Sequence, residues 1–319
     1  GINSNYFKYD HVTSRRQAGS TFKPILYAAA LKNGHDPCAY MSNDSVVYED
    51  YDNWTPRNAG TGYGGYYTMK GALTHSVNTI SVKLLEETGI DEVIDFSRQL
   101  GIEGELPEVL SLALGTGNVS LKEMVQAYSM FLNEGKVVEP IFLKRIEDEQ
   151  GHVIYENESV ISEAVIDPQQ ALLMTEMLKS VVDKGTASSL RTAYGFDNEI
   201  AGKTGTTQNN SDGWFIGFSP ALITGVWVGG DLPAVRFRYG AYGQGASAAL
   251  PVWARYMQKI YRDPLYRYSK QLSFEIPEEI ISELDCEDYL ESESQKKWEK
   301  RRRWIKEILR SDRKRKKNR

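Results

Sequence analysis

Cysteine is almost absent from this sequence. The chain has two cysteines among 319 residues, Cys38 and Cys286. They lie too far apart for a zinc knuckle or a redox CxxC motif, and their spacing does not show whether they form a disulfide. The sequence therefore indicates no metal site, and we expect no cofactor.

Long apolar runs are absent as well. No segment has the 18 or so consecutive apolar residues of a membrane-spanning helix. The first residues, "GINSNYFKYD", include neither an initiating methionine nor the basic and apolar regions of a signal peptide. We expect a fragment that begins inside a larger protein, with any membrane anchor outside this chain.

Basic residues are scarce except at the end of the chain. Residues 296–319 hold 14 basic and 3 acidic side chains, which leaves a charge of −16 on the other 295 residues because the whole chain carries −5. An acidic body argues against a nucleic-acid enzyme, so we expect no nucleic-acid partner. We interpret residues 266–319 as an acidic, then basic tail, solvated and partly helical. Attraction of its basic part to an anionic surface is the alternative.

The remaining composition, 41% apolar and 11% aromatic, is enough for a sizeable core. Apolar spacing in "QAGSTFKPILYAAALKNG" (17–34) predicts a helix that ends near Gly34. Pro24 would clash with the carbonyl of Ser20 inside a regular helix, so Ser20 belongs at the helix start.

Capping signals locate further elements. Thr68 is a predicted N-cap, and the short "SVN" places Ser76 and Asn78 on a connection between two helices. Ser120 with Glu123, and Asp167 followed by proline, predict two more helix starts. "FLKRIEDEQGHVIYE" reads as a hairpin, and strand-like runs after Gly202 predict antiparallel neighbours.

Ser20 and Lys23 are one helical turn apart, so their side chains share a face. A lysine desolvated in a cleft can lose enough basicity to take the hydroxyl proton of a serine. On its own the S-x-x-K pattern is weak, since about one match is expected by chance in a chain of this length.

"KTGTT" (203–207) is a less common motif. Its "GKT" suggests the end of a nucleotide-binding P-loop, but the glycine required five residues before Gly202 is replaced by Asp197. The backbone cradle for phosphates depends on that glycine, so we reject nucleotide binding.

Three motifs occur in a fixed order along the chain: S-x-x-K (Ser20, Lys23), S-x-N (Ser76, Asn78) and K-T-G (Lys203, Thr204, Gly205). Each could be structural alone, as a helix cap, a loop cap or a solvated strand residue. Their joint order and context favour catalysis. This set is typical of penicillin-binding proteins and class A β-lactamases.

The chain resembles the transpeptidase domain of class A penicillin-binding proteins over most of residues 14–230. The segments that carry the resemblance are "SRRQAGSTFKPILYAAAL", "GALTHSVNTISVKLLEETGI", "LGTGNVSLKEMVQAYSMFLNEGKVVEP", "VVDKGTAS" and "IAGKTGTTQNNSDGWFIGFSPALITGVWVG".

The resemblance implies a role for each motif residue. Ser20 is the acylated nucleophile, Lys23 its proton acceptor, Ser76 a relay to the leaving amine, and Asn78 a ligand of the substrate amide. The terminal carboxylate of a D-alanyl-D-alanine stem peptide, or of a β-lactam antibiotic, is bound by the K-T-G strand through Lys203, Thr204, Gly205, Thr206 and Thr207.

The backbone N–H groups of Ser20 and Thr206 form the implied oxyanion hole. The implied fold is α+β in three layers, a mostly antiparallel sheet between helices, within a transpeptidase domain at residues 1–265. The family's first strands and its glycosyltransferase domain have no counterpart here. We therefore expect an exposed sheet edge, lower stability than the intact domain, and a parent anchored on the extracytoplasmic face of a bacterial membrane.

Related activities remain as alternatives. A class A β-lactamase needs an E-x-x-L-N loop, and "EGELPEVLSL" has no asparagine in place. A D,D-carboxypeptidase, in which water replaces the acceptor amine, shares the same motifs. A β-lactam-sensing module without turnover would also retain the serine. The sequence favours a D,D-transpeptidase over all three.

Overall fold

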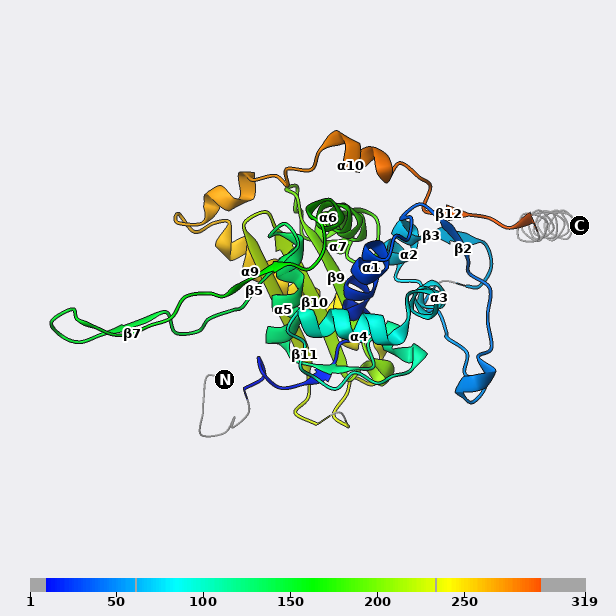
Figure 1. Ribbon diagram of the computed structural model, residues 1–319, viewed down its shortest axis with the longest axis horizontal. Helices are drawn as coiled ribbons and strands as arrows, with labels where there is room; N and C mark the ends of the chain where they lie inside the picture. The colour runs from blue at the N-terminus through cyan, green and yellow to red at the C-terminus, as the bar shows by residue number, and fades with distance from the viewer. Residues whose placement is uncertain (1–9, 61, 233, 294–319) are drawn as a thin grey trace, which may run out of the picture.

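An antiparallel three-stranded sheet lies at the centre of the structure, a computed structural model that describes residues 10–60, 62–232 and 234–293 (Figure 1). Its strands are β9 (Ala201–Thr206), β10 (Asp212–Ser219) and β11 (Leu222–Gly229), with β10 in the middle. Every residue of β10 is buried, whereas every residue of β11 is half-buried. In the described residues β11 thus forms an edge of the sheet, and the absence of the first strands stays a prediction.

Helices cover both faces of this sheet. On one face Trp253 of α9 (Gly245–Ile260) packs against Gly217. On the other, Leu121 and Val125 of α5 (Leu121–Tyr128) pack against Gly225. The long helix α6 (Pro168–Asp183) and the buried helix α1 (Lys23–Lys32) complete the second layer. The arrangement is the three-layer α+β fold that the sequence predicts.

The remaining α-helices of the described residues pack around the helices named above. They are α2 (Met69–His75), α3 (Asn78–Thr88), α4 (Ile90–Gln99), α7 (Ser189–Thr192), α8 (Gly240–Gly243) and α10 (Glu278–Glu283). No helix in the described residues has the length and apolar composition needed to cross a bilayer.

Short strands form small antiparallel sheets around the domain. The pairs are β1 (Arg16–Gln17) with β4 (Asn118–Val119), β5 (Lys136–Val138) with β8 (Ile161–Ala164), and β6 (Arg145–Glu147) with β7 (Val153–Glu156). A three-stranded sheet joins β2 (Tyr40–Ser42), β3 (Tyr66–Thr68) and β12 (Tyr289–Leu290). The β6–β7 pair is the predicted hairpin, and it projects from the domain (Figure 1).

The predicted helix caps are confirmed. The Thr68 side chain accepts a hydrogen bond from the backbone N–H of Gly71, and Ser120 forms a capping box with Glu123. Asp167 is the N-cap of α6, and its backbone N–H donates to the side chain of Gln170 over 3.1 Å. These local signals involve residues three positions apart, so they can be read without knowledge of the tertiary fold.

Two local predictions need correction. Asn78 is the first residue of α3, so the connection after α2 consists of Ser76 and Val77 alone. Helix α9 was not anticipated, because it begins with glycine and contains Pro251, two features that disfavour a helix. Its apolar face is nevertheless buried against β10 and β11, and this packing overrides the weak local propensity.

The described part of the predicted tail, residues 266–293, packs on the domain. Ile280 and Leu284 are 3% exposed and belong to the main core, and Cys286 forms a disulfide with Cys38. The division of the chain at residue 265 stays a prediction, and this packing favours a later boundary. Residues 294–319, which hold the basic part, lie outside the described residues.

Candidate active site

Ser20 lies in a 3-10 turn, η1 (Gly19–Phe22), immediately before α1. Pro24 is in the first turn of α1, where its missing N–H costs no helical hydrogen bond. The turn is anchored by Tyr128, whose hydroxyl donates to the carbonyl of Thr21 over 2.7 Å. Ser20 does not cap the helix, so its half-buried hydroxyl is available for chemistry.

Glycine lets the Ser20 turn approach strand β9 closely. Gly19 has a φ of +55°, and a Cβ at that position would lie 2.8 Å from the carbonyl oxygen of Thr206. A Cβ on Gly205 would lie 2.7 Å from the carbonyl oxygen of Ala18. The backbone around Ser20 and Thr206 is thereby brought together, which is where the sequence predicts the oxyanion hole.

Ser76 sits in the left-handed conformation at the C-cap of α2, with φ +57° and ψ +42°. The N–H of Val77 donates to the carbonyl of Ala72 over 2.9 Å, which is the 6→1 hydrogen bond of a Schellman motif. A non-glycine residue is costly in this conformation, by about 1 kcal/mol or more. Ser76 keeps this unfavourable backbone conformation, and its hydroxyl lies within hydrogen-bond distance of Lys23 and Lys203.

Lys23 and Lys203 both reach the side chain of Ser76. The Nζ atom of Lys23 lies 3.3 Å from Ser76 Oγ, and that of Lys203 lies 3.0 Å from the same oxygen. Lys23 Nζ also donates to the Ser76 carbonyl over 2.8 Å and to Asn78 Oδ1 over 2.7 Å. The described contacts of Lys23 therefore join the first two motifs, and they do not include the direct hydrogen bond to Ser20 Oγ that the sequence suggested.

Burial makes both amines weak bases. Lys23 and Lys203 are 0% exposed. Burial, with a smaller contribution from the charge of Lys203, holds the pKa of Lys23 well below its usual value. Burial lowers the pKa of Lys203 to about 7. A neutral amine in this environment can take a proton at physiological pH.

Asn78 of the second motif is held by the loop between β2 and β3. The backbone N–H of Asn78 donates to the side chain of Asn58 over 2.8 Å, and its side-chain amide donates to the carbonyl of Arg57 over 2.6 Å. These bonds orient the amide oxygen of Asn78 toward Lys23.

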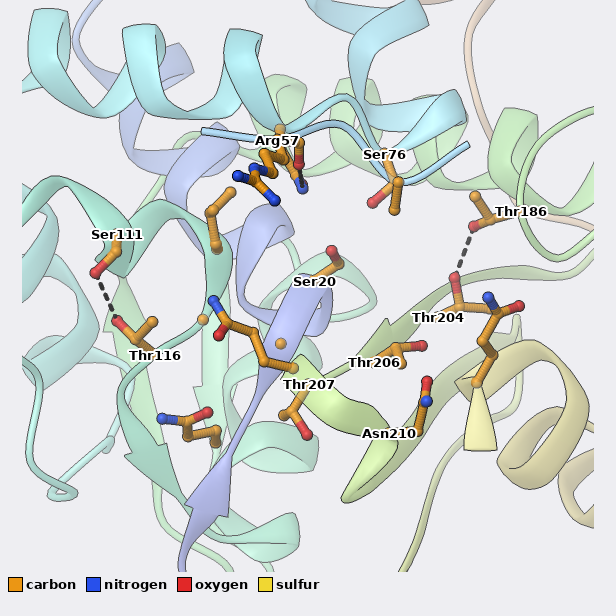
Figure 2. Close-up of a pocket in the computed structure, with 18 of the residues that line it drawn as sticks. Ser20, Arg57, Ser76, Ser111, Thr116, Thr186, Thr204, Thr206, Thr207 and Asn210 are labelled. Carbon is orange, nitrogen blue, oxygen red and sulfur yellow. Dashed lines mark hydrogen bonds between the residues drawn. The ribbon is translucent and has the colours of Figure 1, made fainter. Parts of the chain in front are cut away.

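A cavity of about 1280 Å³ opens above these groups. Figure 2 shows Ser20 in its centre, with Ser76 on one side and the K-T-G strand residues Thr204 and Thr206 on another. Both lysines lie beneath this surface. Among the described residues, the ionisable side chains that line the cavity are Arg57 and His75, with no carboxylate. The cavity therefore suits a ligand with negative charge.

The threonines of the K-T-G strand differ in their partners. The hydroxyl of Thr204 lies 2.7 Å from that of Thr186, and the hydroxyl of Thr206 accepts from the backbone N–H of Gly245 over 3.0 Å. Thr207 donates to the carboxylate of Asp212 over 3.0 Å. Thr204 and Thr206 remain suited to hold a carboxylate, whereas the hydroxyl of Thr207 is occupied by the turn.

Sequence reasoning missed several residues of this site. Thr186 and Thr116 lie in segments quoted for the family resemblance, but no spacing rule links them to Ser20. Arg57 and His75 lack any motif. Arg57 reaches the cavity because its loop is bonded to Asn78, and His75 reaches it from the last turn of α2.

Comparison with known proteins agrees with this geometry. Residues 2–250 match the penicillin binding protein transpeptidase domain. The curated relatives include penicillin-binding protein 1A of Aquifex aeolicus (strain VF5), 38% identical over 273 residues, which are 85% of this chain and 36% of that protein. Penicillin-binding protein 1A of Neisseria lactamica is 38% identical over 253 residues, 76% of this chain and 31% of that protein. The chain spans about a third of the length of these relatives.

Solved structures confirm the predicted fold. Penicillin-binding protein 1A from Haemophilus influenzae matches with a TM-score of 0.74 and 25% identity, covering 83% of this chain and 45% of that one. The PonA1 protein from Mycobacterium tuberculosis, solved in complex with penicillin V, matches in fold with a TM-score of 0.71 and 22% identity, over 86% and 74% of the two chains. Since the family match covers residues 2–250 and the relatives share more than a third of their aligned residues with it, this chain belongs to the penicillin-binding protein transpeptidase domain family.

Proposed function

We propose that the chain is a serine D,D-transpeptidase that cross-links peptidoglycan stem peptides through an acyl-enzyme at Ser20, and that β-lactams acylate the same serine. The observation that carries this proposal is the meeting of two buried lysines at Ser76, beside the cavity that contains Ser20.

In the first half-reaction, Ser20 Oγ attacks the carbonyl carbon of the penultimate D-alanine. The hydroxyl proton passes to the neutral amine of Lys23, directly or through Ser76. The oxyanion is stabilised by the N–H groups of Ser20 and Thr206. The C–N bond then breaks, the Ser76 hydroxyl gives its proton to the leaving D-alanine amine, and protonated Lys23 gives its proton to Ser76, which restores both groups. The product is an ester on Ser20.

In the second half-reaction, an amine of another stem peptide attacks the ester. A new amide bond forms, the C–O bond to Ser20 breaks, and the serine regains its proton from the amine. Asn78 is proposed to bind the substrate amide. Lys203, Thr204 and Thr206 are proposed to hold the terminal carboxylate, with Gly205 and Thr207 shaping the same subsite.

The proposal extends to the compartment. The disulfide between Cys38 and Cys286 is of the kind that persists in oxidising environments. This supports an extracytoplasmic location for the domain, at the membrane face where its parent would meet peptidoglycan.

Labelling with a fluorescent penicillin tests the nucleophile. We expect one covalent adduct on the peptide that contains Ser20, and none in Ser20→Ala. Lys23→Ala should label almost as poorly, because the proton acceptor is lost. Ser111→Ala is the matched control, since this serine lines the same cavity and its hydroxyl lies 3.4 Å from that of Thr116, outside the three motifs. Persistent labelling of Ser20→Ala would contradict the assignment.

A donor peptide ending in D-alanyl-D-alanine, incubated with an amine acceptor, tests the second half-reaction. Cross-linked product supports the transpeptidase. Free acid would indicate a D,D-carboxypeptidase, and stable acylation by penicillin without either product would indicate a sensing module.

A further inference from the structure

Residues 284–290, here called the C-terminal strap, cross the domain and end beside helix α2. Figure 1 shows the chain passing from α10 to β12, which pairs with β3. A disulfide joins Cys286 of the strap to Cys38, in the loop that follows α1. The strap is far from Ser20 in sequence, yet it contacts the elements that carry Ser76 and Thr186.

Asp288 of the strap lies among the side chains of two lysines and a histidine. Its Oδ2 atom is 2.8 Å from Lys184 Nζ and 3.8 Å from His75 Nε2, and its Oδ1 atom is 3.8 Å from Lys70 Nζ. The Asp288 side chain is only 13% exposed. Solvent therefore screens these interactions weakly, and a carboxylate here acts on its neighbours more strongly than one on an open surface.

The strap fixes the position of α2. The backbone N–H of Thr68, the N-cap of α2, donates to the Asp288 carbonyl over 3.1 Å. A Cβ on Gly71 would lie 2.1 Å from that carbonyl oxygen, so the helix touches the strap backbone directly. Lys70 Nζ also donates to the Leu284 carbonyl over 2.5 Å. Because α2 has only seven residues, a shift at its start moves Ser76 at its end.

The strap also contacts the turn after α6, which carries the cavity residue Thr186. Lys184, the closest partner of Asp288, is the C-cap of α6. Two residues later, the Thr186 N–H donates to the carbonyl of Thr74 in α2 over 3.3 Å, and its hydroxyl contacts Thr204. Asp288 thus lies where α2 and the turn after α6 converge.

We propose that Asp288 is a positioning residue that holds Ser76, through α2 and the Lys184 turn, in register with Lys23 and Lys203. The inference rests on the proposed function for the role of Ser76. The distances from Ser76 Oγ to the two amines, 3.3 and 3.0 Å, leave little room for displacement before proton transfer is lost.

The test compares Asp288→Asn with Glu287→Gln in the full chain. The asparagine keeps the shape of Asp288 and removes its charge. Glu287 is an exposed carboxylate on the adjacent residue, so its replacement controls for the change in net charge. Stopped-flow acylation by penicillin separates the initial binding constant from the first-order acylation rate. We expect the Asp288→Asn acylation rate to fall about tenfold or more, with initial binding unchanged within about twofold.

If Asp288 contributed only to stability, another variant of equal stability would lose acylation rate to the same extent. Ile280→Ala removes a buried side chain from α10 and lowers stability without touching Asp288. At temperatures where it is as folded as Asp288→Asn, it should acylate at the wild-type rate. Equal rates in Asp288→Asn and wild type, or an equal loss in Ile280→Ala, would overturn the positioning role.

A second variant covers the case in which Asp288→Asn does not fold. Lys184 is 52% exposed, so Lys184→Met should fold while losing the shortest ion pair to Asp288. We expect a smaller decrease in its acylation rate, about threefold, with Lys122→Met on α5 as the surface control. An unchanged rate in Lys184→Met would then overturn the inference. If wild type itself is not labelled by penicillin, the proposed function fails instead.

Discussion

At the scale of single residues, the site depends on two amines to which the described residues offer no carboxylate partner. Lys23 and Lys203 donate to Ser76, Asn78 and backbone carbonyls, and both are fully buried. A buried lysine without a counter-charge loses its proton more readily than one in water, because desolvation penalises the charged form. The motif spacing alone could not show this, since it says nothing about burial.

The pH dependence of acylation follows from these two groups. The proposed base, Lys23, must be neutral, so the acylation efficiency should rise with pH as this depressed pKa is passed. The proposed carboxylate ligand, Lys203, must be charged, so efficiency should fall as pH passes its pKa of about 7. We expect a bell-shaped profile for the free enzyme, measured with penicillin at subsaturating concentration.

His75 is the alternative source of such a limb, since it lines the same cavity and burial lowers its pKa. His75→Gln should leave both limbs at the same pH. A flat profile between pH 5 and 9, or a limb that disappears in His75→Gln, would show that the lysines do not control acylation.

At the scale of elements, the site is a contact between a 3-10 turn and the first strand of the central sheet. Gly19 and Gly205 allow that contact, because a Cβ on either of them would clash with backbone across the interface. The turn carries Ser20 and the strand carries Thr206. The distance between Ser20 and Thr206 therefore depends on the glycines at this contact as much as on the motif residues.

Gly205→Ala tests the element contact. Its methyl group would lie 2.7 Å from the Ala18 carbonyl oxygen and 2.9 Å from Thr21 Cγ2. Strand β9 must then move away from the turn, and the two oxyanion donors separate. We expect the penicillin acylation rate to fall about 100-fold, the cost typical of losing one such donor. Gly62→Ala, where no atom lies within 4 Å of the new methyl group, is the control. Wild-type acylation by Gly205→Ala would refute this view of the contact.

At the scale of the whole molecule, a segment near the start of the sequence is linked to a segment near its end. The disulfide joins residues 248 positions apart and ties the C-terminal strap to the loop after α1. Buried residues of α10 add to the same core as α1 and the central sheet. Segments at opposite ends of the sequence therefore support one active site.

Reduction of this disulfide should lower stability. A link across so long a stretch constrains the unfolded chain by about 5 kcal/mol in the loop-entropy treatment, which is an upper value. We expect the urea midpoint to fall when a reducing agent is present. A Cys38→Ser and Cys286→Ser double variant should already have the lower midpoint and should not respond to the reductant. Equal midpoints for the oxidised and reduced protein would contradict the structural role of the link.

The sequence by itself determined the helix caps, the hairpin, the antiparallel strands and the identity of the motif residues. Caps such as Ser120 with Glu123 act over three residues, and motifs such as K-T-G are contiguous. Both can therefore be recognised from the sequence alone. The sequence also predicted the fold class, through the family resemblance.

Only the tertiary structure decided how those residues meet. It placed Ser76 between two lysines that are 53 and 127 residues away, closed the cavity with Arg57, and brought Asp288 onto α2. It also buried α9 in spite of Pro251 and paired two cysteines whose spacing left their state open. Burial and long-range contact arise from packing of the whole chain, and no local pattern encodes them.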